Sequence, residues 1–204
     1  MKFTLHLFIY AGLVLIAVGC TTMPPKNLDN ICAIFEEHRA WYHSSKRAFE
    51  EHGIPVHVQM AIIYQESRFR SEAQPERVWI FGIIPWFRPS SAYGYAQVKD
   101  ETWGWYKEKR GRRFASRDDF DDAVDFISWY GRASFDRLHI SKWDAYGQYL
   151  AYHEGQGGYK RKTYLKKPWL INVAKKVKLR AARYHTQLAG CEKELNRSWW
   201  WPFS

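Results

Sequence analysis

The spacing of apolar residues along the chain predicts a protein built mainly from helices. Apolar positions recur every three or four residues over 31–49, 58–63, 120–127 and 171–188, which is the period of an amphipathic helix. Cap residues, glycines and prolines near these stretches mark their ends. We predict six helices. The first begins at Asp29 or Asn30 and ends at Gly53, the second runs from Pro55 to Glu66, and the third runs from about Asp100 to Lys109. The fourth follows Ser116, the fifth follows Ser141, and the last runs from about Pro168 to Leu195.

One segment breaks the helical pattern. Residues 74–98 contain three prolines and the hydrophobic run VWIFGIIPWF at 78–87, which fits a hairpin or a lid. The fold class is therefore mainly α, with any β-structure confined to this insertion. The run at 78–87 has three readings, namely a lid over a cleft, a wedge that touches a membrane, and a loop packed on the core.

Glu66 stands at an unusual place for a carboxylate. Ile62 and Ile63 precede it by four and three residues, so that all three share one helix face. In an apolar setting the pKa of a carboxyl group rises, and the group can act as a general acid. The alternative is a helix-end carboxylate paired with Arg68 or Arg70.

The N-terminus predicts export. The sequence MKFTLHLFIYAGLVLIAVGC has a lysine, an apolar run over 3–19 and then Cys20, the pattern of a secretory signal. Its ending, AVGCTT, resembles the bacterial lipobox, in which the cysteine accepts lipid. We therefore expect a signal over 1–19, a lipidated Cys20 and a tether over 20–29. An uncleaved membrane anchor is the alternative, and both place the remaining chain outside the cytoplasm.

Composition narrows the class of partner. The chain has 204 residues, 46% hydrophobic and 18% aromatic, with a net charge of +10, which suits one folded domain and excludes disorder. The charge implies an acidic partner, and export makes this an anionic lipid or an envelope polymer, with no nucleic acid.

An aromatic tail over 196–204 could lie at a membrane interface or dock on the domain. We expect a monomer.

The cysteines offer a disulfide. With Cys20 carrying lipid, Cys32 and Cys191 remain, and exported compartments permit bridges. A bond between them would tie the first helix after the tether to the last. The alternative is two unpaired buried thiols.

Three motifs occur in a fixed order along the chain. They are Glu-Ser-Arg-Phe at 66–69, Gly-Tyr-Ala-Gln at 94–97 and Ala-Tyr-His-Glu-Gly at 151–155. In this order they resemble the soluble-lytic-transglycosylase (SLT) domain of the lysozyme-like superfamily, over 54–159 and the helix that follows. His153 departs from the asparagine usual in that family. The resemblance implies a lysozyme-like, mainly helical α+β domain over 30–195.

The resemblance also implies a chemistry. It is cleavage of the bond between N-acetylmuramic acid (MurNAc) and N-acetylglucosamine (GlcNAc) in peptidoglycan, in the periplasm at the outer membrane, with 1,6-anhydro-MurNAc ends. Glu66 would serve as acid and then as base, without metal or organic cofactor. Gln97 and Tyr152 would hold the saccharide, and Tyr93 or Tyr95 would stack beneath it. The implied substrate-binding residues are Ser67, Tyr93, Gly94, Tyr95, Gln97, Tyr152, His153, Glu154 and Tyr159.

Two rival functions stay open. A muramidase on the same fold would need a second carboxylate to place a water molecule; the candidates are Glu72, Asp100, Asp125 and Glu154. A non-catalytic lipoprotein could keep the groove and only bind peptidoglycan. The His-Glu pair at 153–154 lacks the second histidine of a zinc motif, so we predict no metal site.

Overall fold

The computed structural model describes residues 22–81 and 83–197. The predicted signal, Cys20 and residues 198–204 of the predicted tail over 196–204 lie outside the described residues. The described chain is mainly helical, which confirms the predicted fold class. Its helices are α1 (Ile31–Glu37), α2 (Arg39–His52), α3 (Val56–Ser67), α4 (Asp100–Arg110), α5 (Phe120–Leu138), α6 (Ala145–Lys160), a 3-10 turn η2 (Thr163–Lys166) and α7 (Pro168–Leu195).

The first predicted helix is in fact two. Asn30 caps α1 by accepting from the backbone N–H groups of Cys32 and Ala33, as its side chain allows. The helix then breaks at His38, whose φ and ψ are −127° and 70°. The prediction of one continuous helix was wrong because the two halves pack on different partners, α1 on α7 and α2 on α5.

Helix α3 is the central helix of the core. Nine of its twelve residues are buried, and the other three, residues 64–66, are half-buried. Pro55 is the N-cap of α3, so the helix begins one residue later than the predicted start at Pro55. Gln59, a buried polar residue, donates from Nε2 to the carbonyls of Ser45 and Ile54 at 3.1 and 2.7 Å, which joins α3 to α2 and to the preceding loop.

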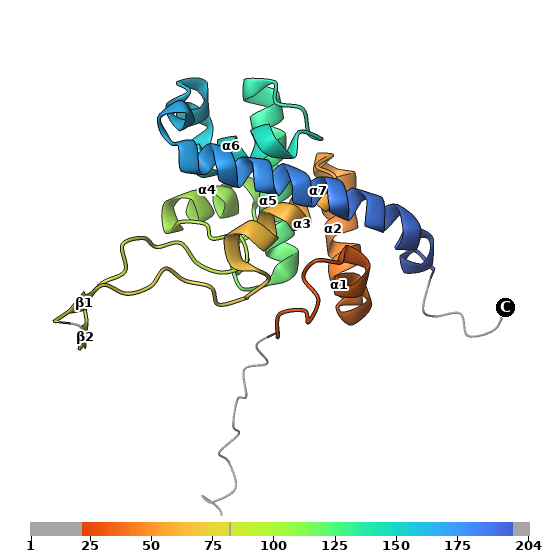
Figure 1. Ribbon diagram of the computed structural model, residues 1–204, viewed down its shortest axis with the longest axis horizontal. Helices are drawn as coiled ribbons and strands as arrows, with labels where there is room; N and C mark the ends of the chain where they lie inside the picture. Colours follow the sequence, from red (N-terminus) through yellow and green to blue (C-terminus); the bar gives the residue numbers. More distant parts are fainter. Residues whose placement is uncertain (1–21, 82, 198–204) are drawn as a thin grey trace, which may run out of the picture.

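Helix α7 lies across the other helices, and Figure 1 shows it in blue over α3. It packs on α3, α6 and α1. Its observed bounds are those predicted. The predicted inward residues Ala174, Val177, Ala181, Tyr184 and Leu188 are buried. The remaining one, Ile171, is half-buried.

Part of the insertion forms a hairpin that stands away from the helices (Figure 1). Strands β1 (Trp79–Ile80) and β2 (Ile84–Pro85) pair antiparallel, with Trp79 opposite Pro85. Both strands lie within residues 74–98, the segment to which we predicted that any β-structure would be confined. Among the described residues, no helix has the length and apolar character needed to cross a membrane.

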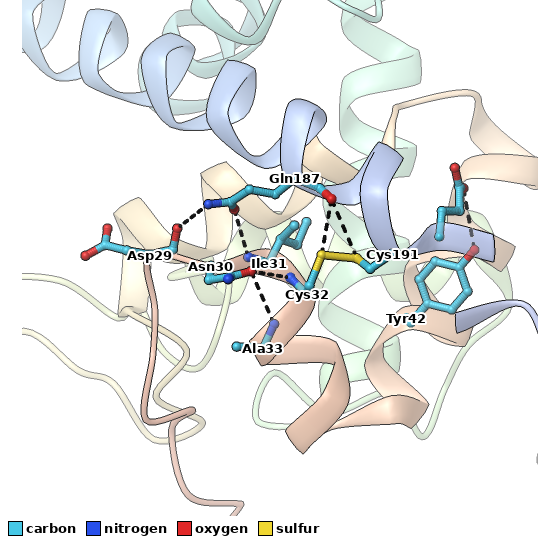
Figure 2. The surroundings of a disulfide bond; sticks show 9 residues. Asp29, Asn30, Ile31, Cys32, Ala33, Tyr42, Gln187 and Cys191 are labelled. Atoms are coloured by element: carbon cyan, nitrogen blue, oxygen red, sulfur yellow. Dashed lines mark hydrogen bonds between the residues drawn. A yellow bond between two sulfur atoms is a disulfide. The ribbon is translucent and has the colours of Figure 1, made fainter. Parts of the chain in front are cut away.

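Cys32 and Cys191 are joined by a disulfide whose Cα atoms lie 6.1 Å apart and whose residues are separated by 159 positions (Figure 2). Gln187 supports it from α7. Its side chain accepts from the Ile31 N–H at 3.0 Å and donates to the Asp29 carbonyl at 3.1 Å. The Cys32 sulfur lies 3.2 Å from the Gln187 carbonyl, a contact without a donated hydrogen because the oxidised sulfur has none. The start of the described domain is thus fixed to its last helix.

Loss of the bridge should destabilise the fold. We predict that Cys191→Ser lowers the free energy of unfolding by about 2–4 kcal/mol, because the unfolded chain is no longer closed into a long loop. Urea unfolding followed by circular dichroism measures this. The matched control is Ala189→Ser, an exposed neighbour on α7. Equal midpoints for the two variants, with no effect of dithiothreitol on the unsubstituted chain, would contradict the prediction.

Candidate active site

The end of α3 is fixed by a buried aromatic residue. Arg68 and Phe69 both have positive φ, 52° and 60°, a costly backbone for side chains other than glycine. Phe69 offsets this cost because it is fully buried and stacks on Trp41, with ring centroids 5.8 Å apart. The helix therefore stops one residue after Glu66, which leaves this carboxyl group in the last turn.

Glu66 lines a cleft of about 520 Å³. The cleft walls come from the end of α3, the turn over 92–99, the first turn of α4, and parts of α5 and α6. It brings together five of the predicted site residues, which are Glu66, Gln97, Tyr152, His153 and Glu154. Their carboxyl, amide, phenol and imidazole groups can all form hydrogen bonds with a polar ligand.

The carboxyl group of Glu66 is held in a dry setting. Its Oε1 is buried and has no hydrogen-bond partner among the described residues. Burial raises its pKa from the ordinary 4.5 to about 7, and the Tyr149 hydroxyl on α6 opposes this only in part. A group with this pKa is substantially protonated near neutrality and can donate a proton.

The predicted arginine partners of Glu66 are engaged elsewhere. Arg70 donates from Nε to the Ser67 carbonyl at 3.2 Å, and Arg68 lies over the Tyr64 ring, 5.6 Å from its centroid. In the described part of the chain Glu66 forms no ion pair. The structure therefore does not support the reading of Glu66 as a salt-bridged helix end.

Gly94 anchors the turn that faces Glu66. Its φ is +78°, and a Cβ there would lie 2.0 Å from the Arg117 carbonyl oxygen, so only glycine fits. Gln97 closes the turn by donating from Nε2 to the carbonyls of Ala73 and Gly94 at 2.7 and 2.9 Å. Its Nε2 is thereby occupied, and its Oε1 is the atom left for a ligand.

Tyr95 and Tyr93 do not lie where a stacking residue is needed. Tyr95 is 1% exposed and packs edge-on against Trp41 and Phe120 in the core, so the prediction that it stacks beneath a sugar was wrong. Tyr93 is half-buried, donates to Asp118 and lies beneath the Arg117 guanidinium. It is not among the residues that line the cleft.

Three further predicted residues lie outside the cleft lining. Ser67 is 1% exposed and donates to the Ile63 carbonyl at 3.3 Å, because successive residues of a helix point in different directions. Gly94 is buried against Arg117. Tyr159 packs on Tyr164, with centroids 5.3 Å apart, and lines a separate cavity. Each of the three shapes the structure around the site.

Tyr152 joins α6 to the turn. Its hydroxyl donates to the Ala96 carbonyl at 2.6 Å, so its oxygen remains free to accept. Burial raises its pKa well above 10, which keeps the proton in place. Next to it, the His153 Nδ1 lies 3.2 Å from the Glu154 carboxylate, and the imidazole edge meets Trp169 at 5.2 Å between centroids.

Glu154 is held by its neighbours. Its side chain is 3% exposed, and Lys167 donates to it at 2.7 Å while the Thr163 hydroxyl donates to its other oxygen. Burial by itself would raise its pKa, but these hydrogen bonds outweigh it and lower the pKa to about 2. The adjacent Gly155 has a φ of +71° and kinks α6. Residues 152–155 of the motif line the cleft.

The other carboxylates considered for a hydrolase lie away from Glu66. Asp125 is buried and lies 3.0 Å from both His52 and Arg112. Burial by itself would raise its pKa, but hydrogen bonds from His52 and Tyr106 and the charge of Arg110 hold the pKa below its usual range. Asp100 pairs with Arg117 at 2.8 Å. Glu72 lines a different cavity. In the described residues these three form no part of the cleft lining.

Sequence reasoning missed several residues of the cleft. Lys99, Glu101 and Thr102 come from the first turn of α4 and the residue before it, and Phe126 and Tyr130 come from α5. The spacing of Phe126 and Tyr130 by four residues places them on one helix face, a signal present in the sequence. Glu101 is an exposed carboxylate for which the described structure shows no ion pair.

One acidic cluster has the spacing of a metal site. Ligand atoms of Glu51, His52 and Asp125 lie within 4.8 Å of one another. Arg110 already bonds to Glu51 and lies 3.4 Å from Asp125, and Arg112 adds a second cation. Because these guanidinium groups balance the carboxylates, the cluster reads as a structural ion network.

The residues of the cleft all lie within a segment, 8–191, that matches the family described as Transglycosylase SLT domain. The chain belongs to this family. No curated protein and no solved structure matches it. Membership associates this SLT domain with peptidoglycan and with its cleavage by lytic transglycosylases, and hence with an exported protein.

The buried carboxyl group makes the stability of this SLT domain depend on pH. Because the pKa of Glu66 is higher in the folded than in the unfolded chain, the contribution of this group to stability is largest below about pH 4.5 and falls by about 3 kcal/mol as the pH rises through about 7. Glu66→Gln removes the charge and keeps the shape. We predict that it is more stable than the unsubstituted chain at pH 8 and equally stable near pH 4, as measured by urea unfolding.

The control for this prediction is Glu101→Gln, which removes an exposed carboxylate from the same cleft. A stability gain at pH 8 that is as large for Glu101→Gln as for Glu66→Gln would show that the cause is net charge and not burial. No gain for Glu66→Gln at any pH would show that this carboxyl group is not desolvated.

Proposed function

We propose that this SLT domain cleaves the MurNAc–GlcNAc bond of peptidoglycan and leaves 1,6-anhydro-MurNAc ends, with Glu66 as the only acid and base. The observation that carries the proposal is the buried, unpartnered Oε1 of Glu66, together with a pKa raised to about 7. A single group that is partly protonated near neutrality can both give and accept a proton there.

The reaction needs no second carboxylate. Glu66 donates its proton to the glycosidic oxygen as the bond to C1 of the muramic acid breaks. The resulting carboxylate then takes the proton of the muramic 6-hydroxyl, whose oxygen closes on C1. No water is added, and Glu66 ends protonated as it began. The attacking hydroxyl belongs to the substrate, which supplies a high effective concentration.

The proposed saccharide contacts are Gln97, Tyr152 and His153, which line the cleft with Glu66. Gln97 and Tyr152 offer acceptor oxygens, because their donors are used within the protein. Phe126 and Tyr130 are 1% and 9% exposed, so they form a dry wall and not a stacking surface. This wall supports the high pKa of Glu66 by excluding water.

Glu154 has a positioning part in this scheme. It is bonded to Lys167 and Thr163 and lies beside His153, so it orients the imidazole and is not free to place a water molecule.

We further propose that the protein is exported with a signal over 1–19 and is anchored in the outer membrane by lipid on Cys20. Its tether would be 20–29, and it would act as a monomer in the periplasm.

The product test uses a chain that begins after Cys20. We predict that it releases soluble fragments from purified sacculi one water lighter than hydrolysis products, as measured by mass spectrometry. Glu66→Gln should lower the release by about 10²-fold or more, because the proton donor is lost. Hydrated reducing ends would contradict the transglycosylase. Intact binding to sacculi with no fragments from either form would indicate a binding lipoprotein.

A muramidase is the second candidate, and Glu101 is the observation that favours it. Glu101 lines the cleft with Glu66 and, in the described chain, forms no ion pair. If Glu66 acts alone, Glu101→Gln should leave the fragment masses unchanged and change the rate by less than about tenfold. If Glu101→Gln instead abolishes hydrated reducing ends and also slows fragment release, Glu101 would be the general base of a hydrolase.

A further inference from the structure

The hairpin exposes a concentrated apolar surface. We call residues 77–81 and 83–88 the apolar arm; it contains β1 and β2. Its large apolar side chains with high exposed fractions are Phe81 (90%), Ile83 (78%), Trp86 (62%), Phe87 (54%), Trp79 (53%) and Val78 (43%). Soluble proteins seldom expose so many large apolar groups together unless the surface meets a partner.

The arm is ordered in layers from tip to base. The backbone N–H of Val78 donates to the Phe87 carbonyl, and that of Trp86 to the Val78 carbonyl, both at 2.8 Å. This pairing places Phe81 and Ile83 at the tip and the two tryptophans behind them. Arg77 and Arg88 flank the arm at its base, and residues 77–91 include no acidic side chain.

This order is that of one leaflet of a lipid bilayer. Apolar side chains suit the acyl region, tryptophan suits the interface, and arginine suits anionic headgroups. We propose that the apolar arm inserts its tip into the surface of a bilayer that contains anionic lipid. The arm would then hold the SLT domain at the membrane, independently of any lipid on Cys20.

Two observations favour a bilayer over a lid on the cleft. No described residue of the arm lines the cleft that holds Glu66, and Figure 1 shows the arm pointing away from the helices. A third concerns the tether. Thr22, Met23 and Pro24 line a cavity at the base of the arm with Glu76 and Arg88. The lipid proposed on Cys20, two residues before Thr22, would tether this same end of the domain to a membrane.

The first test measures vesicle binding. The chain used begins after Cys20, since every residue of the described core lies between Ile31 and Leu195. Vesicles hold equal parts of phosphatidylcholine and phosphatidylglycerol, and flotation gives the bound fraction. We expect Phe81→Ser combined with Ile83→Ser to weaken binding about tenfold or more, because two large apolar side chains lose their burial.

The matched control combines Phe114→Ser with Leu179→Ser, two apolar side chains that are 100% and 68% exposed on the body of the domain. This pair should bind as the unsubstituted chain does. Arg77→Gln should weaken binding to the anionic vesicles and leave binding to pure phosphatidylcholine unchanged. No vesicle binding by the unsubstituted chain, or equal binding by the tip pair, would overturn the proposal.

The second test locates the contact. In a chain that begins after Cys20, the two remaining cysteines are bridged, so Ile83→Cys provides one free thiol for a polarity-sensitive fluorophore. Its emission should shift to the blue on vesicle binding, whereas a label on Phe114→Cys should not shift. A shift at position 114 alone would mean that another face binds, and would overturn the proposal.

A third readout separates this proposal from catalysis and from a lid. The tip pair should release fragments from sacculi at the unsubstituted rate when no lipid is present. Slower release without lipid would show that the arm acts on the glycan, and would overturn the bilayer proposal. Failure of all forms to cleave sacculi would refute the proposed function and leave the vesicle result as it stands.

Discussion

Burial of most of α3 is the constraint on which the rest of the structure depends. Helix α7 crosses it, α2 and α5 pack on it, and α6 meets it near its last turn. Glu66 lies in the last turn of this helix, where it lines the cleft, and the burial of Phe69 fixes the helix end. The same enclosure removes water from Glu66 and raises its pKa to about 7. Fold and proposed chemistry therefore have one physical origin, the desolvation of a carboxyl group by the core.

The elements around Glu66 are held by bonds that leave little freedom. Gly94 lets the 92–99 turn approach the Arg117 backbone, and Tyr152 ties that turn to α6. The Cys32–Cys191 bridge and Gln187 fix the start of the described domain to α7. Preorganisation of this kind suits a site whose proposed reaction depends on position and proton transfer, with no metal to orient the substrate.

Periodicity predicted the helices well because each buries a regular apolar stripe, and α7 begins and ends as predicted. The break at His38 was missed because it arises from different packing partners, which no local pattern records. Tyr95 was misplaced for a similar reason. A motif gives the identity of a residue but not the side of the turn on which its ring lies, and here the ring completes an aromatic cluster with Trp41. Glu101 was overlooked because no motif includes it, although it is the second residue of α4, the helix that follows the Gly-Tyr-Ala-Gln motif.

The most direct measurement of the central claim is a titration of the Glu66 carboxyl carbon by NMR, in a chain labelled at glutamate side chains and assigned with Glu66→Gln. The account predicts a midpoint near pH 7, because the burial seen in the structure disfavours the charged form. A midpoint near the ordinary 4.5 would show that water reaches the carboxylate, and would contradict the assignment of Glu66 as the group that gives and takes the proton.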